Sequence, residues 1–288
     1  MTISELLILV ASGLFAGILA GFLGIGGGTV LVPLLVALNY APVQAVATSG
    51  LSIAITAISG SIQNRRMGYL SMSKVAGIGL PAVITAQIGA YWAGIFPPYL
   101  LLVSFGLLLW LNIYLIEVRK HITANGKGEG KGEDDPIAKA ATNPQSPIPN
   151  SQLPNNSNIL SNPAFAKIAT GSAAGLLAGL FGVGGGVIMV PLQILLLGES
   201  IKTAIQTSLG VIVITAISAT AGHAARGNVL WVVGLILGGG GLLGAQISTR
   251  FLPRLPDRII SLAFRSLLAI LSIYVFWQAW QIFSHGND

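Results

Sequence analysis

One glycine-rich stretch decides the fold, and it occurs twice: Gly21-Phe22-Leu23-Gly24-Ile25-Gly26-Gly27-Gly28-Thr29-Val30-Leu31-Val32-Pro33-Leu34 and Gly179-Leu180-Phe181-Gly182-Val183-Gly184-Gly185-Gly186-Val187-Ile188-Met189-Val190-Pro191-Leu192. Every glycine and the proline keep their places between the copies. The first copy lies in an uncharged run over residues 6–38, which as one helix would be about 50 Å long. Because the hydrocarbon layer of a bilayer is only about 30 Å thick, we expect a break between Gly24 and Pro33.

The composition is that of a polytopic, all-α membrane protein. Of the 288 residues, 53% are hydrophobic and 8% are charged, whereas soluble domains carry about 25% charged residues. The net charge of +6 is better explained by basic anchors at the ends of membrane spans than by nucleic-acid binding. A cleaved signal peptide is not expected, because Glu5 and no basic residue precede the first apolar run.

The two halves of the chain repeat each other beyond the glycine-rich stretches. At an almost constant offset, Thr56-Ala57-Ile58-Ser59 returns as Thr215-Ala216-Ile217-Ser218, and Ala86-Gln87-Ile88 returns as Ala245-Gln246-Ile247. We therefore predict two homologous transmembrane repeats, residues 1–118 and 164–288, each with a first helix broken by Gly and Pro. Residues 119–163, rich in Gly, Asn, Pro and Ser, have too little apolar sequence to fold alone and are predicted to be a disordered cytoplasmic linker.

Further details of the spans can be predicted from glycine and proline. Gly13, Gly17 and Gly21 form a ladder of small residues that allows close helix contact, and the second half has an equivalent ladder. The span over residues 75–96 is expected to be interrupted at Gly79 and Pro81.

The relative orientation of the repeats depends on how each broken stretch crosses the membrane. One crossing per stretch gives four spans per half and parallel repeats; two passes give five segments per half and inverted repeats. The inverted arrangement places the basic residues, except Arg226, on one side of the membrane. The positive-inside rule therefore favours inverted repeats, whereas the short second arms favour the parallel arrangement.

The duplicated break is the main candidate for a binding site. Successive glycines expose backbone N–H groups, and a helix that starts after them points its positive end inward, which suits an anion. The alternative is that the glycines only permit tight helix crossing. Paired interruptions of this kind are typical of carrier binding sites. The predicted substrate-binding residues are Gly26, Gly27, Gly28, Thr48, Ser49, Gln87, Gly184, Gly185, Gly186, Thr207, Ser208, Gln246 and Arg265.

Several of these residues have a structural explanation as well. The four hydroxyl residues either cap the helices that follow or bind substrate, and the two glutamines either tie helices together or bind substrate. Arg265 either serves function within the membrane or extends to the interface. Asn64, Arg65 or Arg66, with His223 and Arg226 in the second half, fit interface anchors better than ligands.

The sequence lacks the signs of an enzyme. Its acidic residues stand near the ends of spans, which argues against a carboxylate proton relay or a carboxylate-built cation site. It has no metal-ligand cluster, catalytic triad or paired carboxylates, so no metal and no cofactor are predicted.

With its duplicated Gly-x-Gly-Gly-Gly signature, Pro33 and Pro191, the Thr-Ser pairs, and the loops Arg66-Met67-Gly68 and Arg226-Gly227-Asn228, the sequence resembles the sulfite exporter TauE/SafE family of membrane permeases. The resemblance implies a secondary carrier in the cytoplasmic membrane that moves sulfite, thiosulfate, sulfonates or related anions. An anion channel, or a non-transporting scaffold that acts through the linker, are the alternatives. The expected partners are a small anion and the lipid bilayer, and a homo-oligomer is compatible with the sequence.

Overall fold

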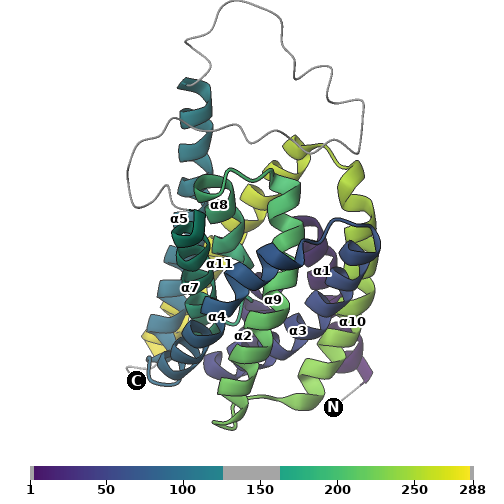
Figure 1. Ribbon diagram of the computed structural model, residues 1–288. Helices are drawn as coiled ribbons and strands as arrows, with labels where there is room; N and C mark the ends of the chain where they lie inside the picture. Colours follow the sequence, from purple (N-terminus) through teal and green to yellow (C-terminus); the bar gives the residue numbers. More distant parts are fainter. Residues whose placement is uncertain (1–2, 126–162, 286–288) are drawn as a thin grey trace, which may run out of the picture.

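The computed structural model describes residues 3–125 and 163–285, and for residues 115–125 and 285 it describes the backbone alone (Figure 1). The described part consists of helices without strands. In the first half they are α1 (Ile3–Leu23), α2 (Gly28–Ala37), α3 (Pro42–Arg66), α4 (Met72–Ala93) and α5 (Pro98–Asn125). In the second half they are α7 (Pro163–Phe181), α8 (Gly186–Leu196), α9 (Ile201–Ala224), α10 (Trp231–Phe251), the 3₁₀ turn η2 (Leu252–Arg254) and α11 (Asp257–His285).

Seven of the helices within the described part are long and apolar enough to cross a membrane, which confirms a multi-pass, all-α protein. In contrast, α2 and α8 have only 10 and 11 residues. At 1.5 Å per residue they are about 15 Å long, half the thickness of the hydrocarbon layer.

The predicted break occupies the first part of the expected interval. Helix α1 ends at Leu23 and α2 starts at Gly28, and Gly24, Gly26 and Gly27 between them have φ of 68°, 78° and 79°. Side chains other than glycine rarely adopt these left-handed values, so the glycines end the helix. Pro33 does not contribute to the break, because it lies inside α2.

The predicted interruption at Gly79 and Pro81 is wrong, because α4 is continuous through both residues. A proline inside a buried membrane helix is tolerated where neighbouring groups satisfy the freed carbonyl. The predicted linker falls largely outside the described residues: α5 continues to Asn125, and α7 begins at Pro163.

The two glycine ladders place each first helix against the fourth helix of the other half. Helix α1 runs parallel to α10, with Gly13, Gly17 and Gly21 against Leu237, Gly241 and Ser248. Helix α7 runs parallel to α4 in the same way. A Cβ atom on any of the six ladder glycines would lie only 1.9–2.2 Å from an oxygen of the facing helix, so the backbones approach closely, as small residues allow.

The halves are inverted relative to each other. Helices α3 and α9, which are equivalent by sequence, cross antiparallel, because Gly50 faces Thr220 whereas Gly60 faces Leu209. The inverted alternative is therefore the one observed.

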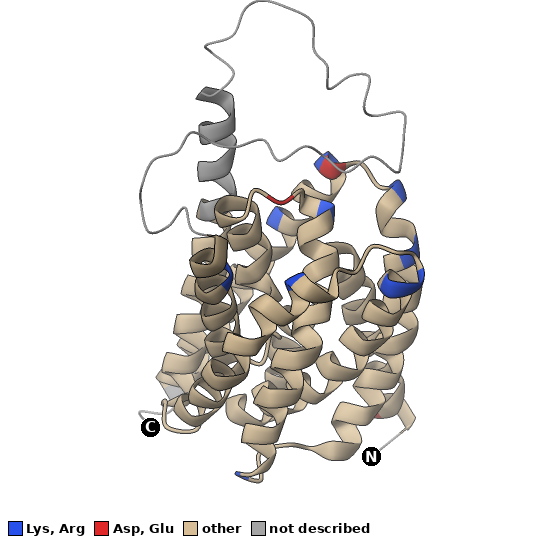
Figure 2. Ribbon diagram, in the orientation of Figure 1, with Lys and Arg blue, Asp and Glu red and all other residues tan. Residues whose placement is uncertain are grey.

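Basic residues gather at one end of the described part (Figure 2), with the exception of the α9–α10 connection at the other end, which contains Arg226. At the basic end Lys74 pairs with Glu199 at 2.5 Å and Lys202 pairs with Asp257 at 3.6 Å. The positive-inside rule predicts that this end faces the cytoplasm.

Single cysteines test this topology, because the chain contains none. Ser71 and Ala225 are exposed residues in the equivalent α3–α4 and α9–α10 connections. In intact cells, a membrane-impermeant maleimide should label Ala225→Cys and not Ser71→Cys, and it should label both in permeabilised cells. Labelling of both variants, or of neither, in intact cells would contradict inverted repeats.

Candidate functional site

The two glycine breaks lie against each other in the middle of the protein. A Cβ atom on Gly28 would lie 2.4 Å from the Gly182 carbonyl oxygen, and one on Gly186 would lie 2.1 Å from the Gly24 carbonyl oxygen. Each break therefore contacts the other through its backbone. The sequence repeat predicted two such breaks, and the structure brings them together in one place.

Two serines hold the breaks in contact. Ser49 Oγ lies 2.8 Å from the Gly182 carbonyl oxygen, and Ser208 Oγ lies 2.9 Å from the Gly24 carbonyl oxygen. The single hydrogen of each hydroxyl is shared between this carbonyl and one of its own helix, that of Val46 or Ile205. Each serine thus binds the carbonyl at the break of the opposite half. Where a helix ends, its last carbonyls lose their intrahelical donors, and a buried carbonyl without a partner costs about 1–3 kcal/mol. Thr215 adds a bond from its Oγ1 to the Gly184 carbonyl at 2.9 Å.

The helix-capping explanation for the Thr-Ser pairs is wrong. The N-cap of α3 is Ala41 and that of α9 is Ser200, several residues before the pairs. Thr48 instead accepts a hydrogen bond from the Leu230 backbone N–H at 3.1 Å. Thr207 is buried beside Ser208 in the sequence.

Helices α2 and α8 both begin at this contact, and their first turns lack side-chain caps. Their N-caps, Gly27 and Gly185, have left-handed backbones and make no side-chain cap hydrogen bond, and Gly28 and Gly186 are buried. The first N–H groups of a helix have no intrahelical acceptor, and the helix dipole places roughly half a positive charge there. Two such buried ends, each against the break of the opposite half, form a centre that is lined mainly by backbone.

Two isoleucines that the sequence analysis did not single out close this centre. Ile53 contacts Gly26, Gly28 and Gly184, and Ile212 contacts Gly26, Gly184 and Gly186. Both side chains are fully buried. An isoleucine within an apolar run gives no signal in the sequence, so only the packing identifies this pair.

The other predicted site residues lie elsewhere or have packing roles. A Cβ on Gly27 or Gly185 would meet the Ala16 or Ala174 carbonyl of its own repeat. Gln87 Nε2 donates to the Ser218 carbonyl at 2.6 Å, and Gln246 Nε2 donates to the Ser59 carbonyl at 3.4 Å. These contacts favour the helix-tying role of the glutamines. Arg265 lies half-buried on α11, which packs mainly against α5.

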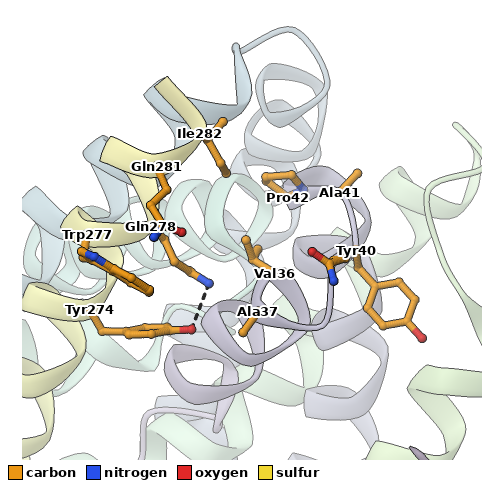
Figure 3. Close-up of a pocket in the computed structure, with 11 residues that line it drawn as sticks. Val36, Ala37, Tyr40, Ala41, Pro42, Tyr274, Trp277, Gln278, Gln281 and Ile282 are labelled. Atoms are coloured by element: carbon orange, nitrogen blue, oxygen red, sulfur yellow. Dashed lines mark hydrogen bonds between the residues drawn. The ribbon is translucent and has the colours of Figure 1, made fainter. Parts of the chain in front are cut away.

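A pocket of about 540 Å³ lies at the other end of α2, between its C-terminal residues and α11 (Figure 3). Gln278, only 6% exposed, lies in its wall; its Nε2 donates to the Pro33 carbonyl and to Tyr274 Oη, both at 3.1 Å. Its Oε1 is buried without a hydrogen-bond partner. Because α11 starts at the basic end with Asp257 and runs away from it, this pocket lies toward the opposite end.

The serine bonds lead to a stability prediction. Ser49→Ala and Ser208→Ala should each lower the free energy of unfolding by about 1–3 kcal/mol, because each leaves a buried carbonyl without a donor. Ser266→Ala is the matched control, since its hydroxyl is exposed and bonds only within its own helix. Thermal unfolding in detergent measures the three variants, and equal melting of all three would contradict the role assigned to the serines.

Comparison with known proteins agrees with this architecture. The chain is 26% identical over 282 residues to the probable membrane transporter protein YunE of Bacillus subtilis (strain 168). This alignment covers 94% of this chain and 97% of the relative. It is 26% identical over 286 residues to a probable membrane transporter protein of Xylella fastidiosa (strain 9a5c), covering 97% and 98%. No solved structure matches the chain. The sequence profile of the sulfite exporter TauE/SafE family matches residues 9–275, and the chain therefore belongs to this family of membrane transporters.

Proposed function

We propose that the protein is a secondary carrier of a small sulfur-containing anion, such as sulfite, thiosulfate or an organosulfonate, across the cytoplasmic membrane. One observation carries the proposal: the uncapped N-termini of α2 and α8 are both buried where the two glycine breaks touch, each against the break of the opposite half. The anion binds between these two helix ends.

The electrostatics of the centre favour an anion over a cation. Helix N-termini offer N–H donors and positive potential, and they act most strongly where water is excluded. The acidic residues of the sequence stand near the ends of spans rather than in their middle, so a cation at the same place would find no carboxylate. Half-helices that start at the midplane are typical of sites for anionic substrates in carriers.

The inverted halves and the closed centre favour a carrier over an open channel. Ile53 and Ile212 fill the space beside the glycines, so an ion reaches the helix ends only after these side chains move. The pocket beside Gln278 is an entry or exit chamber on one side of the membrane. The bond from Gln278 to the Pro33 carbonyl links that chamber to α2, and movement of one half against the other would expose the site alternately to the two sides.

The choice of sulfur oxyanions as substrates comes from the family. Its description names sulfite, whereas the relatives are described only as probable membrane transporters. Sulfite, thiosulfate, taurine, sulfoacetate, sulfate and chloride therefore form the panel for testing, at matched ionic strength.

Substitutions at Ile53 test the anion site. Wild-type protein should be stabilised in thermal unfolding by one sulfur oxyanion, by about 2.7 kcal/mol at about 100 times its dissociation constant. Ile53→Asp should abolish that stabilisation and the transport of the anion, because a carboxylate placed at the helix ends occupies the site. Ile53→Asn, of equal size and without charge, should retain binding.

The same variants separate the alternatives. Equal loss of binding in the Asp and Asn variants would mean that the centre serves packing alone. In proteoliposomes, a carrier gives counterflow of labelled anion driven by unlabelled anion on the other side, and flux without counterflow would indicate a channel.

A further inference from the structure

His223 is an ionisable side chain placed at the second glycine break. It is 1% exposed, the only Asp, Glu, His, Lys or Arg among the described side chains that is so deeply buried. Its Nε2 lies 2.8 Å from the Gly179 carbonyl oxygen. A carbonyl only accepts, so Nε2 carries the hydrogen, and the neutral ring has its lone pair on Nδ1. That Nδ1 is buried without a hydrogen-bond partner.

The Gly179 carbonyl is available because α7 ends two residues later, at Phe181. The last carbonyls of a helix lack intrahelical donors and carry the negative end of the helix dipole. His223 therefore caps α7 directly before the break at Gly182. A cation is stabilised at a helix C-terminus, whereas burial disfavours the charged ring, so the two effects oppose each other at this position.

The equivalent position in the first half is Asn64, which carries no ionisable group. Asn64 is fully buried, and neither of its amide atoms has a hydrogen-bond partner. The helix arrangement thus accommodates a neutral amide at this place, and the repeat alone does not require a histidine. Only the second half has a group that binds a proton here.

Few other charged or titratable groups face His223. Arg226 of the same helix donates to the Gly222 carbonyl and lies over the ring of Tyr91, at 5.3 Å from its centroid. The described basic residues on the other elements packed against α9 belong to the basic end; they are Arg65, Arg66, Lys74 and Lys167. Glu5 of α1 lines a separate small pocket.

We propose that His223 is the proton-coupling residue of the carrier: a proton bound at Nδ1 favours a conformation in which the end of α7 moves, and anion transport is thereby coupled to proton movement. The step is simple, since hydronium gives its proton to the Nδ1 lone pair and the imidazole becomes imidazolium. In the present conformation the new Nδ1–H would find no acceptor, so proton binding favours another conformation in which it reaches one. A ligand shifts an equilibrium between states only when it binds them differently.

The movement reaches the anion site through the chain itself. Gly179 is three residues before Gly182, whose carbonyl is held by Ser49, and α8 begins at Gly186. A displaced end of α7 therefore shifts the break and the helix end that receives the anion. His223 itself lies about 16 Å along α9 from Ile212, so its role is positioning and coupling rather than contact with the anion.

Transport by the full-length protein in proteoliposomes tests this coupling, which rests on the proposed function. Thiosulfate is the probe, because its charge does not change between about pH 5.5 and 8, where histidine titrates. In wild type, a pH gradient that is acidic on the side of anion entry should raise the initial rate at least about fivefold, with acidification of the lumen reported by a trapped dye. His223→Gln keeps an N–H donor for Gly179 and binds no proton, so its rate should change less than about twofold with no acidification. Asn64→Gln is the matched control and should behave as wild type.

The outcomes are distinguishable. Anion flux in wild type without any response to the pH gradient would overturn the coupling and leave the proposed function standing. An unchanged pH response in His223→Gln would show that the histidine is only a structural cap, and would also overturn it. Absence of flux of every anion in wild type would count against the proposed function, and the coupling would then be decided by a second measurement.

That second measurement needs no substrate. Thr220, buried one turn before His223 with a hydroxyl that has no partner, is replaced by cysteine in this cysteine-free chain. At about pH 5.5, a methanethiosulfonate reagent should label Thr220→Cys about fivefold faster than the same variant carrying His223→Gln. Comparison at one pH removes the pH dependence of the thiol itself. Equal labelling of the two proteins would overturn the proposal.

Discussion

The structure depends on one constraint: inside a membrane every backbone N–H and C=O needs a partner within the protein. Each glycine break ends a helix inside the protein and removes the partners of several carbonyls. Ser49 and Ser208 satisfy the carbonyls at Gly182 and Gly24, each from the opposite half, and His223 satisfies Gly179. The N–H groups at the starts of α2 and α8 are treated differently, because no side chain caps them. The acceptors have partners within the protein, and in the carrier proposed above the donors bind the anion.

The inverted arrangement goes together with these contacts between the two halves. Each broken helix pair obtains one serine donor, and the helix on which its glycine ladder packs, from the other repeat. The glycine ladders place α1 on α10 and α7 on α4, while the serines of α3 and α9 reach across the centre. The site thus belongs to the contact between the halves, and a change in that contact changes the site.

Much of this could be read from the sequence, because it rests on residues with strong backbone preferences. The triple glycines predicted the breaks, the glycine ladders of α1 and α7 predicted close helix contact, and the distribution of basic residues favoured inverted repeats. Pro33 and Pro81 were less informative, since a proline inside a membrane helix is tolerated by its surroundings. The residues that contact the breaks could not be predicted from the sequence. A serine is equally suited to a cap or to a distant carbonyl, and Ile53 looks like any other apolar residue until the packing is known. The same holds for Gln278, one of whose two hydrogen-bond partners, the Pro33 carbonyl, lies 245 residues earlier in the chain.

Each first helix packs on a helix of the other half, and this has a consequence for biosynthesis. Helix α1 is synthesised before α10, on which its glycine ladder packs, and α10 is complete only at Phe251, roughly 230 residues later. At about 5–20 residues per second, the ladder is without its partner for roughly 10–45 s. During that interval a helix face shaped for tight backbone contact lies against lipid or against another protein. The nascent first half therefore lacks the partner of its glycine ladder until α10 is inserted.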